Sequence, residues 1–135
     1  LNREFPLPAY RFNSHFTYRK LDVERMRLAS AYLIGEHDFQ SFCAAGAQVK
    51  TTVRTIYALD VEKQGDLIIL RITGNGFLYN MVRIIAGTLM KIGQGDWEPE
   101  CIPEILAGCD RQLAGPTAPA RGLTLMEIHF KGEKG

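Results

Sequence analysis

Residues 74–95 read GNGFLYNMVRIIAGTLMKIGQG, a Gly-Asn-Gly turn followed by a run that is apolar on nearly every face of a helix. A helix of this kind is normally buried in a core. Asn80, Arg83 and Gly87 fall at spacings of three and four, so on one helix they share a face. An arginine in the middle of such a helix needs a partner, because an unpaired buried charge costs on the order of several kcal/mol. The glycine removes a side chain and lets another group approach.

Two interpretations of this face stay open. In the first, the helix holds one charged group toward a site. In the second, the arginine is exposed at a helix end and the glycine serves packing only, and the pattern taken alone favours this second interpretation. The preceding Gly-Asn-Gly could hold a phosphate, since helix N-termini bind anions. It matches neither GxGxxG nor a P-loop, however, so a tight turn between strand and helix is favoured.

The residues before this helix alternate in the manner of a β-hairpin. Residues 67–73 form one β-rich run, residues 50–62 form another, and a Lys-Gln-Gly-Asp turn separates them. In the earlier run, one face is predicted to carry Val53, Tyr57, Leu59 and Val61, and the other mostly Arg54, Asp60 and Glu62. Lys50, Arg54 and Arg71 could contact phosphate from this hairpin. The alternative, which the pattern favours, is a solvated face on which the acidic residues balance the charge.

The N-terminal part predicts a strand and a helix. Residues 10–18 alternate with period two and place aromatic residues on one face, which is typical of a strand. Residues 23–34 have apolar positions at helical spacing. Asp22 is the predicted N-cap of this helix, and Gly35 is its predicted C-terminal stop.

Residues 35–46 are predicted to form a loop that Phe39 and Phe42 anchor to the core. His37 and Asp38, which are neighbours in this loop, could suggest acid–base chemistry. A cap or turn role for the aspartate is favoured, because Asp side chains commonly bind their own backbone in turns.

The C-terminal part predicts a helix over residues 97–108, a loop rich in Pro, Ala and Gly over 110–122, and a strand over 123–131. Pro99 suits the start of the helix, whereas Pro103 leaves its first residue open. The order β-α-β-β-α-(α)-β is that of the split βαβ plan. We therefore predict an α+β, ferredoxin-like fold in a single domain, with a four-stranded antiparallel sheet and helices packed on one face. That fold hosts many functions and does not settle the chemistry.

Size and charge exclude several classes of protein. The 135 residues suit one core, and an apolar share of 46% is ordinary for a globular protein. The net charge of +1 gives no global field that attracts nucleic acid, so RNA binding needs a local patch. No apolar run reaches the length of a membrane span. The first ten residues lack a signal-peptide pattern and an initial methionine, so we expect part of a longer protein.

The chain has three cysteines, Cys43, Cys101 and Cys109, and no CxxC spacing. The histidines lie far from them in sequence, so neither a zinc site nor a disulfide framework is expected. Thiols in a reducing cytoplasm are the default interpretation.

Four segments combine into a specific pattern: LDVERMRLASAYLIGEHDFQSF (residues 21–42), VRTI (53–56), GNGFLYNMVRIIAGTLMKIGQG (74–95) and AGPTAPARGLTL (114–125). In this combination the chain resembles the C-terminal half of the TruA-type tRNA pseudouridine synthases. The resemblance implies an enzyme that isomerises uridine to pseudouridine in the anticodon stem-loop of tRNA, at positions 38 to 40. Such enzymes break the N-glycosidic bond, turn the base and rejoin it through carbon, without a cofactor or a metal.

The resemblance also implies roles for single residues. The family nucleophile is an aspartate in an Arg-Thr-Asp-x-Gly motif of the N-terminal half; this chain has no such motif, and Asp110 does not match it. Arg83 corresponds to the arginine of Met-Val-Arg, which pairs with the catalytic aspartate across the cleft. Leu123 resembles the apolar residue that packs under the target base, although Leu125 is close by. Ile84 departs from the family pattern, since many members have asparagine there.

Lys50, Arg54 and Asn80 are the residues that we predict to contact RNA. The implied partners are tRNA, the N-terminal half of the same protein and a second copy in a homodimer, in the cytoplasm and without a membrane. The chain alone is expected to be inactive, because the nucleophilic aspartate is absent. One rival is a non-catalytic, ferredoxin-like RNA-binding module, which needs exposed aromatic residues on the open sheet face. Another is a structural or regulatory domain, which leaves Arg83 and Gly87 unexplained.

Overall fold

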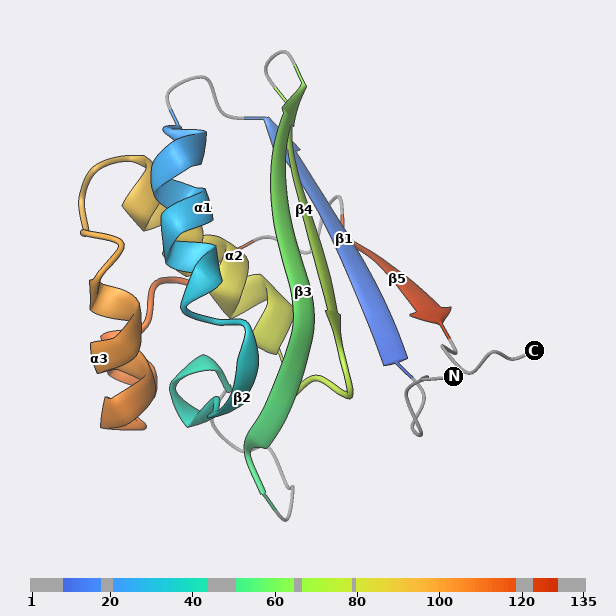
Figure 1. Cartoon of the computed structure of the whole chain (residues 1–135). Coiled ribbons are helices and arrows are strands. Elements are labelled where there is room, and N and C mark those ends of the chain that lie inside the picture. Colours follow the sequence, from blue (N-terminus) through green and yellow to red (C-terminus); the bar gives the residue numbers. More distant parts are fainter. Residues whose placement is uncertain are drawn as a thin grey trace.

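The computed structural model describes residues 9–17, 21–43, 51–64, 67–78, 80–118 and 123–128. In chain order the strands and α-helices are β1 (Ala9–Thr17), α1 (Val23–Ala31), β2 (Gly35–Asp38), β3 (Val53–Gln64), β4 (Leu67–Gly74), α2 (Met81–Gly93), α3 (Cys101–Gly108) and β5 (Leu123–Ile128). Two short 3-10 helices, η1 (Gln40–Phe42) and η2 (Arg111–Leu113), follow β2 and α3. Figure 1 shows the three α-helices on one face of the sheet.

Within the described residues, the sheet has five strands in the order β2-β3-β4-β1-β5, and its pairings are antiparallel. Because β1 and β3 both pair with β4, they run in the same direction with β4 between them. In the same way, β4 and β5 both pair with β1 and enclose it. These are two split βαβ units, with α1 in the first crossover and α2 in the second. The predicted α+β, ferredoxin-like fold is confirmed (Figure 1).

The fifth strand, β2, corrects the prediction of a loop over residues 35–46. It pairs with the first residues of β3 at the edge of the sheet. Its sequence, Gly-Glu-His-Asp, has no apolar alternation, so only pairing with a neighbouring strand makes it extended. The two phenylalanines after it, Phe39 and Phe42, are fully buried and anchor this segment to the core, as predicted.

A bulge in β3 changes which of its side chains face the core. The register of β3 against β4 shifts directly after Ile56, and such an extra residue reverses the alternation of the strand. Ile56 therefore joins Leu59 and Val61 in the core, while Val53 is 39% exposed and Tyr57 is only half-buried. The prediction that Val53 lies on the same face as Leu59 and Val61 is therefore wrong.

Both ends of α1 follow from local side-chain and backbone chemistry. Asp22 caps the helix as predicted, since its Oδ1 accepts a hydrogen bond from the backbone N–H of Glu24 at 3.0 Å. The helix ends at Ala31, three residues earlier than predicted, and Gly35 follows with φ of +108°, which glycine adopts without strain. The Asp22 N–H donates to the carbonyl of Gly93 at 2.9 Å and ties the start of α1 to the end of α2.

The remaining boundaries differ from the predictions by a few residues. The third helix begins at Cys101 rather than at residue 97, so Pro103 lies in its first turn. A backbone N–H there has no partner within the helix, and proline therefore costs no hydrogen bond. The last strand, β5, is confirmed to Ile128, and its predicted residues 129–131 lie outside the described part of the chain. The first strand is predicted to end at Tyr18, which also lies outside the described part.

Candidate active site

The helix α2 is buried as predicted, with ten of its 13 residues in the interior. It begins at Met81, later than the sequence predicts, because Asn80 takes the left-handed conformation with φ of +60° and is the N-cap. Asn80 therefore precedes the helix instead of lying on its face. Arg83 is the third residue of α2 and lies in the first turn, so the prediction of an arginine in the middle of the helix is also wrong.

The guanidinium of Arg83 is held in place by two hydrogen bonds. Its Nε donates to the carbonyl oxygen of Ala118 at 2.7 Å, and its Nη1 donates to Oδ1 of Asn80 at 3.2 Å. The contact with Ala118 is reciprocal, since the Ala118 N–H donates to the Arg83 carbonyl at 2.9 Å. The side chain is partly buried, and its orientation is therefore fixed from both sides.

The positive charge of Arg83 has no carboxylate partner among the described residues. The ion pairs found there are Arg25–Glu98, Arg27–Glu24, Arg71–Glu62 and Lys91–Asp96. A guanidinium has five N–H donors, and two of those of Arg83 bind described residues, which leaves three for an acceptor outside that part of the chain. The first turn of α2 carries no acidic residue, and the N-terminal end of a helix itself favours negative charge. This end of α2 is thus suited to bind an anion.

Gly87, one turn after Arg83, is where the chain returns to α2. A Cβ on this glycine would lie 1.7 Å from the carbonyl oxygen of Pro116 and 2.8 Å from its carbonyl carbon. No side chain fits there, so only glycine allows the backbone of the 114–118 loop to reach the helix. The prediction that Gly87 admits a neighbouring group is confirmed, and the neighbour is the loop that also binds Arg83.

Thr88 fixes the same loop from inside the protein. Its hydroxyl donates to the Ile84 carbonyl at 2.8 Å and accepts from the backbone N–H of Gly115 at 2.8 Å. A Cβ on Gly115 would lie 2.8 Å from Thr88 Cα, so the two backbones touch at a second glycine. Thr88 is fully buried. Sequence reasoning missed this residue, although a lone hydroxyl in an apolar helix is a usable signal.

The structure brings only some of the other predicted site residues to Arg83. Asn80 contacts it directly. Arg54 lies beside Gly76, and its Nη1 donates to the carbonyls of Thr51 and Val53; no contact with Arg83 is found in the described residues. Leu123 opens β5 and pairs through its backbone with β1, while its side chain lies outside what the structure describes. Lys50 lies outside the described residues.

The Gly74-Asn75-Gly76 segment has a structural explanation. The N–H of Asn75 donates to the Thr55 carbonyl at 3.0 Å, and its Oδ1 accepts from the Thr55 N–H at 3.0 Å. A Cβ on Gly74 would lie 2.7 Å from the same carbonyl. Because α2 begins only at Met81, this turn is not the N-terminus of a helix, and the tight-turn interpretation holds.

His37 and Asp38 are likewise held by the backbone around them. Asp38 Oδ1 accepts from the N–H of Gln40 at 3.1 Å and from the hydroxyl of Thr52, and His37 Nε2 lies 3.0 Å from the carbonyl of Ile34. The favoured turn role of the aspartate is therefore confirmed.

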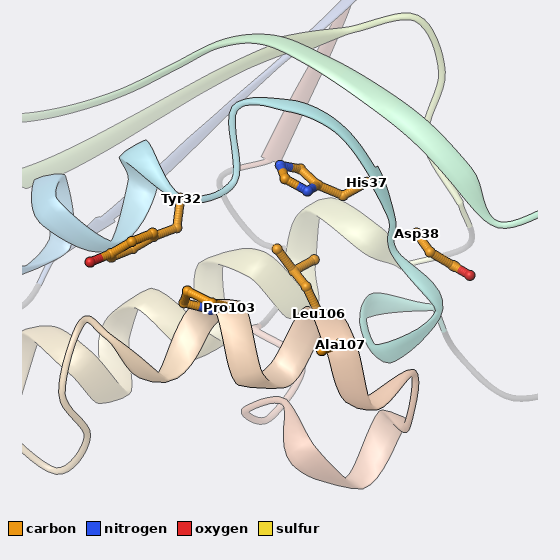
Figure 2. A pocket seen from close by; sticks show the side chains of 6 residues that line it. All are labelled: Tyr32, His37, Asp38, Pro103, Leu106 and Ala107. Carbon is orange, nitrogen blue, oxygen red and sulfur yellow. The ribbon is translucent and has the colours of Figure 1, made fainter.

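The two residues line a surface pocket of about 460 Å³ that Figure 2 shows between α3 and the end of α1. Tyr32, Pro103, Leu106 and Ala107 complete its lining. Arg83 is not among the residues that line this pocket, so the pocket and the anchored arginine are separate features.

The favoured alternative, a hairpin surface on which acidic residues balance the basic ones, is confirmed for the pair Arg71 and Glu62. Arg71 Nη1 lies 2.6 Å from Oε1 of Glu62, and both side chains are partly exposed. Hydrogen bonds from Gln64 and Arg71 lower the pKa of the Glu62 carboxyl below its ordinary value of 4.5. Arg71 is therefore engaged within the sheet surface.

Fold and site together define an antiparallel α+β domain of the split βαβ type that presents one anchored arginine at the start of a buried helix. A family model described as tRNA pseudouridine synthase matches residues 29–131. The chain belongs to this family. Across 121 residues it is 55% identical to tRNA pseudouridine synthase A of Brevibacillus brevis, a match that covers 90% of this chain and 49% of that relative. Across 123 residues it is 46% identical to tRNA pseudouridine synthase A of Geotalea daltonii, covering 91% of this chain and 50% of that relative.

The chain thus spans about half the length of the curated relatives that it matches. None of the helices in the described ranges is both long and apolar enough to cross a membrane.

Proposed function

We propose that this chain forms one wall of the active cleft of a tRNA pseudouridine synthase. The substrate is uridine in the anticodon stem-loop of tRNA, at positions 38 to 40, as the family resemblance implies. The observation that carries the proposal is Arg83, a partly buried arginine that two hydrogen bonds fix and that lacks a carboxylate partner among the described residues. In the family that the chain resembles, the catalytic aspartate lies in the N-terminal half of the protein. An arginine of this kind in the C-terminal half is needed to pair with it.

In this proposal, the N–H groups of Arg83 that do not bind Ala118 or Asn80 donate hydrogen bonds to the catalytic aspartate of the N-terminal half. A planar guanidinium can bind a carboxylate through two parallel hydrogen bonds, which fixes distance and angle together. The positive charge lowers the pKa of the carboxyl and keeps it ionised, so that it can attack or polarise C1′ of the uridine. Since the bonds of Arg83 to Ala118 and Asn80 exist before any partner arrives, the site is preorganised.

We propose roles for the other candidate site residues as well. Leu123 packs under the target base, and Lys50, Arg54 and Asn80 contact the RNA backbone. Asn80 has a further role here, because its amide oxygen holds the Nη1 of Arg83. As the family resemblance implies, the reaction is an isomerisation for which we propose no cofactor and no metal. The whole enzyme acts on tRNA as a cytoplasmic homodimer.

A chimera tests this function. Residues 9–128 replace the matching half of the Brevibacillus brevis relative, and tritium release from tRNA labelled in uridine measures pseudouridine formation. We expect turnover from the chimera and none from a version in which the aspartate of the Arg-Thr-Asp-x-Gly motif is changed to Asn. A folded chimera without turnover, beside an active parent relative, would contradict the proposal. The coding sequence upstream of Leu1 gives a second check, because it should encode that motif.

A further inference from the structure

Hydrogen bonds at three points hold the 110–118 segment against the helical layer. At its start, the backbone N–H of Asp110 donates to Oγ of the fully buried Ser41 at 2.7 Å. In its middle, the N–H of Gly115 binds the Thr88 hydroxyl. At its end, Ala118 exchanges two hydrogen bonds with Arg83. The segment that fixes the Arg83 guanidinium is therefore itself fixed along its length.

Both terminal nitrogens of the Arg111 guanidinium donate hydrogen bonds to residues of this segment. Its Nη1 donates to the carbonyl of Gly115 at 2.9 Å, and its Nη2 donates to Oγ1 of Thr117 at 3.2 Å. The Gly115 peptide is thus held on its N–H by Thr88 and on its carbonyl by Arg111. Thr117 directly precedes Ala118, the residue whose carbonyl binds Arg83. One planar guanidinium spans both points, which a lysine ammonium does not do.

We propose that Arg111 is a positioning residue for Arg83. By holding Gly115 and Thr117, it sets the place of the Ala118 carbonyl, and that carbonyl sets the orientation of the Arg83 guanidinium toward an incoming carboxylate. The consequence for catalysis rests on the proposed function, whereas the coupling between the two arginines does not. The sequence gives no signal for this role, since Arg111 stands in a loop without periodicity.

Nuclear magnetic resonance of the 135-residue chain tests the coupling directly. A hydrogen-bonded N–H is expected to exchange with water more slowly than a free one, so the exchange rate of the Arg83 Nε–H reports its bond to Ala118. We expect Arg111→Ala to speed this exchange about five- to tenfold, the factor that corresponds to roughly one net hydrogen bond. Arg111→Lys should restore part of the protection. Arg27→Ala is the matched control, because Arg27, like Arg111, donates to a backbone carbonyl: its Nε donates to that of Val61 at 2.9 Å, on a different part of the fold.

A second variant tests whether the effect of Arg111→Ala comes from the loss of its hydrogen bonds or from a general loss of structure. Thr117→Val removes the acceptor at the other end of the same bond, so the Arg111→Ala, Thr117→Val double variant should add little to Arg111→Ala alone. Unchanged Arg83 exchange in Arg111→Ala, or an equal increase in the Arg27→Ala control, overturns the inference.

Activity provides a separate readout in the chimera described above. We expect Arg111→Ala to lower kcat about tenfold and to change KM for tRNA by less than about twofold, as for loss of preorganisation rather than of binding. A rise in KM with unchanged kcat overturns the positioning role. An inactive parent chimera overturns only the proposed function, because the exchange of the Arg83 Nε–H is measured without turnover.

Discussion

The carbonyl oxygen of Pro116 lies 1.7 Å from the position that a Cβ on Gly87 would take. This contact joins two segments that are far apart in sequence, the buried helix α2 and the loop that precedes β5. It places the loop next to the first turn of α2, where Ala118 binds Arg83. Gly87 thus helps to hold the candidate catalytic arginine, because the absence of a side chain lets the loop that binds Arg83 reach the helix.

Gly87→Ala is expected to destabilise the protein although alanine is the better helix former. The gain in helix propensity is about 1 kcal/mol, whereas overpacking against a backbone carbonyl costs about 1–3 kcal/mol and here requires the loop to move. Urea unfolding of the chain measures the balance. Gly76→Ala is the control, because its Cβ would meet Arg54 at 3.6 Å, an ordinary contact. A Gly87→Ala protein more stable than the parent would show that the loop is not held against α2.

Thr88→Val should cost about 1–3 kcal/mol, since it leaves the buried N–H of Gly115 without its acceptor. Ser30→Ala is a matched control: Ser30 is also buried and its hydroxyl donates to the carbonyl four residues earlier, but within the described part of the chain it accepts no hydrogen bond from another segment. We expect the control to lose less than about 1 kcal/mol. Equal losses in thermal unfolding of the two variants would argue against a role of Thr88 in holding the loop.

The chain by itself should not form pseudouridine in tRNA, because it lacks the Arg-Thr-Asp-x-Gly motif and no carboxylate of the described residues pairs with Arg83. Tritium release from uridine-labelled tRNA, incubated with the purified 135-residue chain, measures this. The active chimera serves as the positive control. Turnover above the background without protein would mean that the chain carries its own nucleophile, and the division of roles proposed above would be wrong.

The ion pair between Glu62 and Arg71 predicts a dependence of stability on pH. The pKa of Glu62 is lower in the folded protein than its ordinary value of 4.5, first through its bond with Gln64 and then through Arg71. A carboxyl of this kind stabilises the fold above its unfolded pKa, and the stabilisation is lost as pH falls through the folded pKa. The Tm of the parent should therefore exceed that of Glu62→Gln at neutral pH, and the difference should close as the pH falls below 4.5 and through the lowered pKa of Glu62 in the folded protein. A difference that is constant with pH would exclude the effect.

The sequence was sufficient for the order of elements, because the apolar alternation of β3 and β4 and the capping of α1 by Asp22 are local signals. The sequence was insufficient where pairing with a neighbouring strand decides whether a segment is extended. The four residues of β2 form a strand only because they pair with β3. The bulge after Ile56 was also hidden, since one extra residue in a strand leaves no trace in composition.

The site shows the same division between local and distant signals. Arg83 and Gly87 could be singled out because a charge and a glycine are exceptional in an apolar helix. Their actual contacts, Ala118 and Pro116, lie in a loop about thirty residues further on, and no spacing rule relates such a loop to a helix. Thr88 and Arg111 were missed because their partners are backbone groups of that loop.

The central claim is that Arg83 positions a carboxylate of the other half of the enzyme. The direct measurement is the single-turnover rate of pseudouridine formation by the Arg83→Ala and Arg83→Lys chimeras, set beside their thermal midpoints. We predict a loss of about 10²-fold or more for Arg83→Ala, as for removal of one preorganised electrostatic group, with the fold retained. Arg83→Lys should recover only part of the rate, since one ammonium does not replace a planar fork. Near-parental turnover of the Ala variant, or a loss that follows unfolding alone, would contradict the claim.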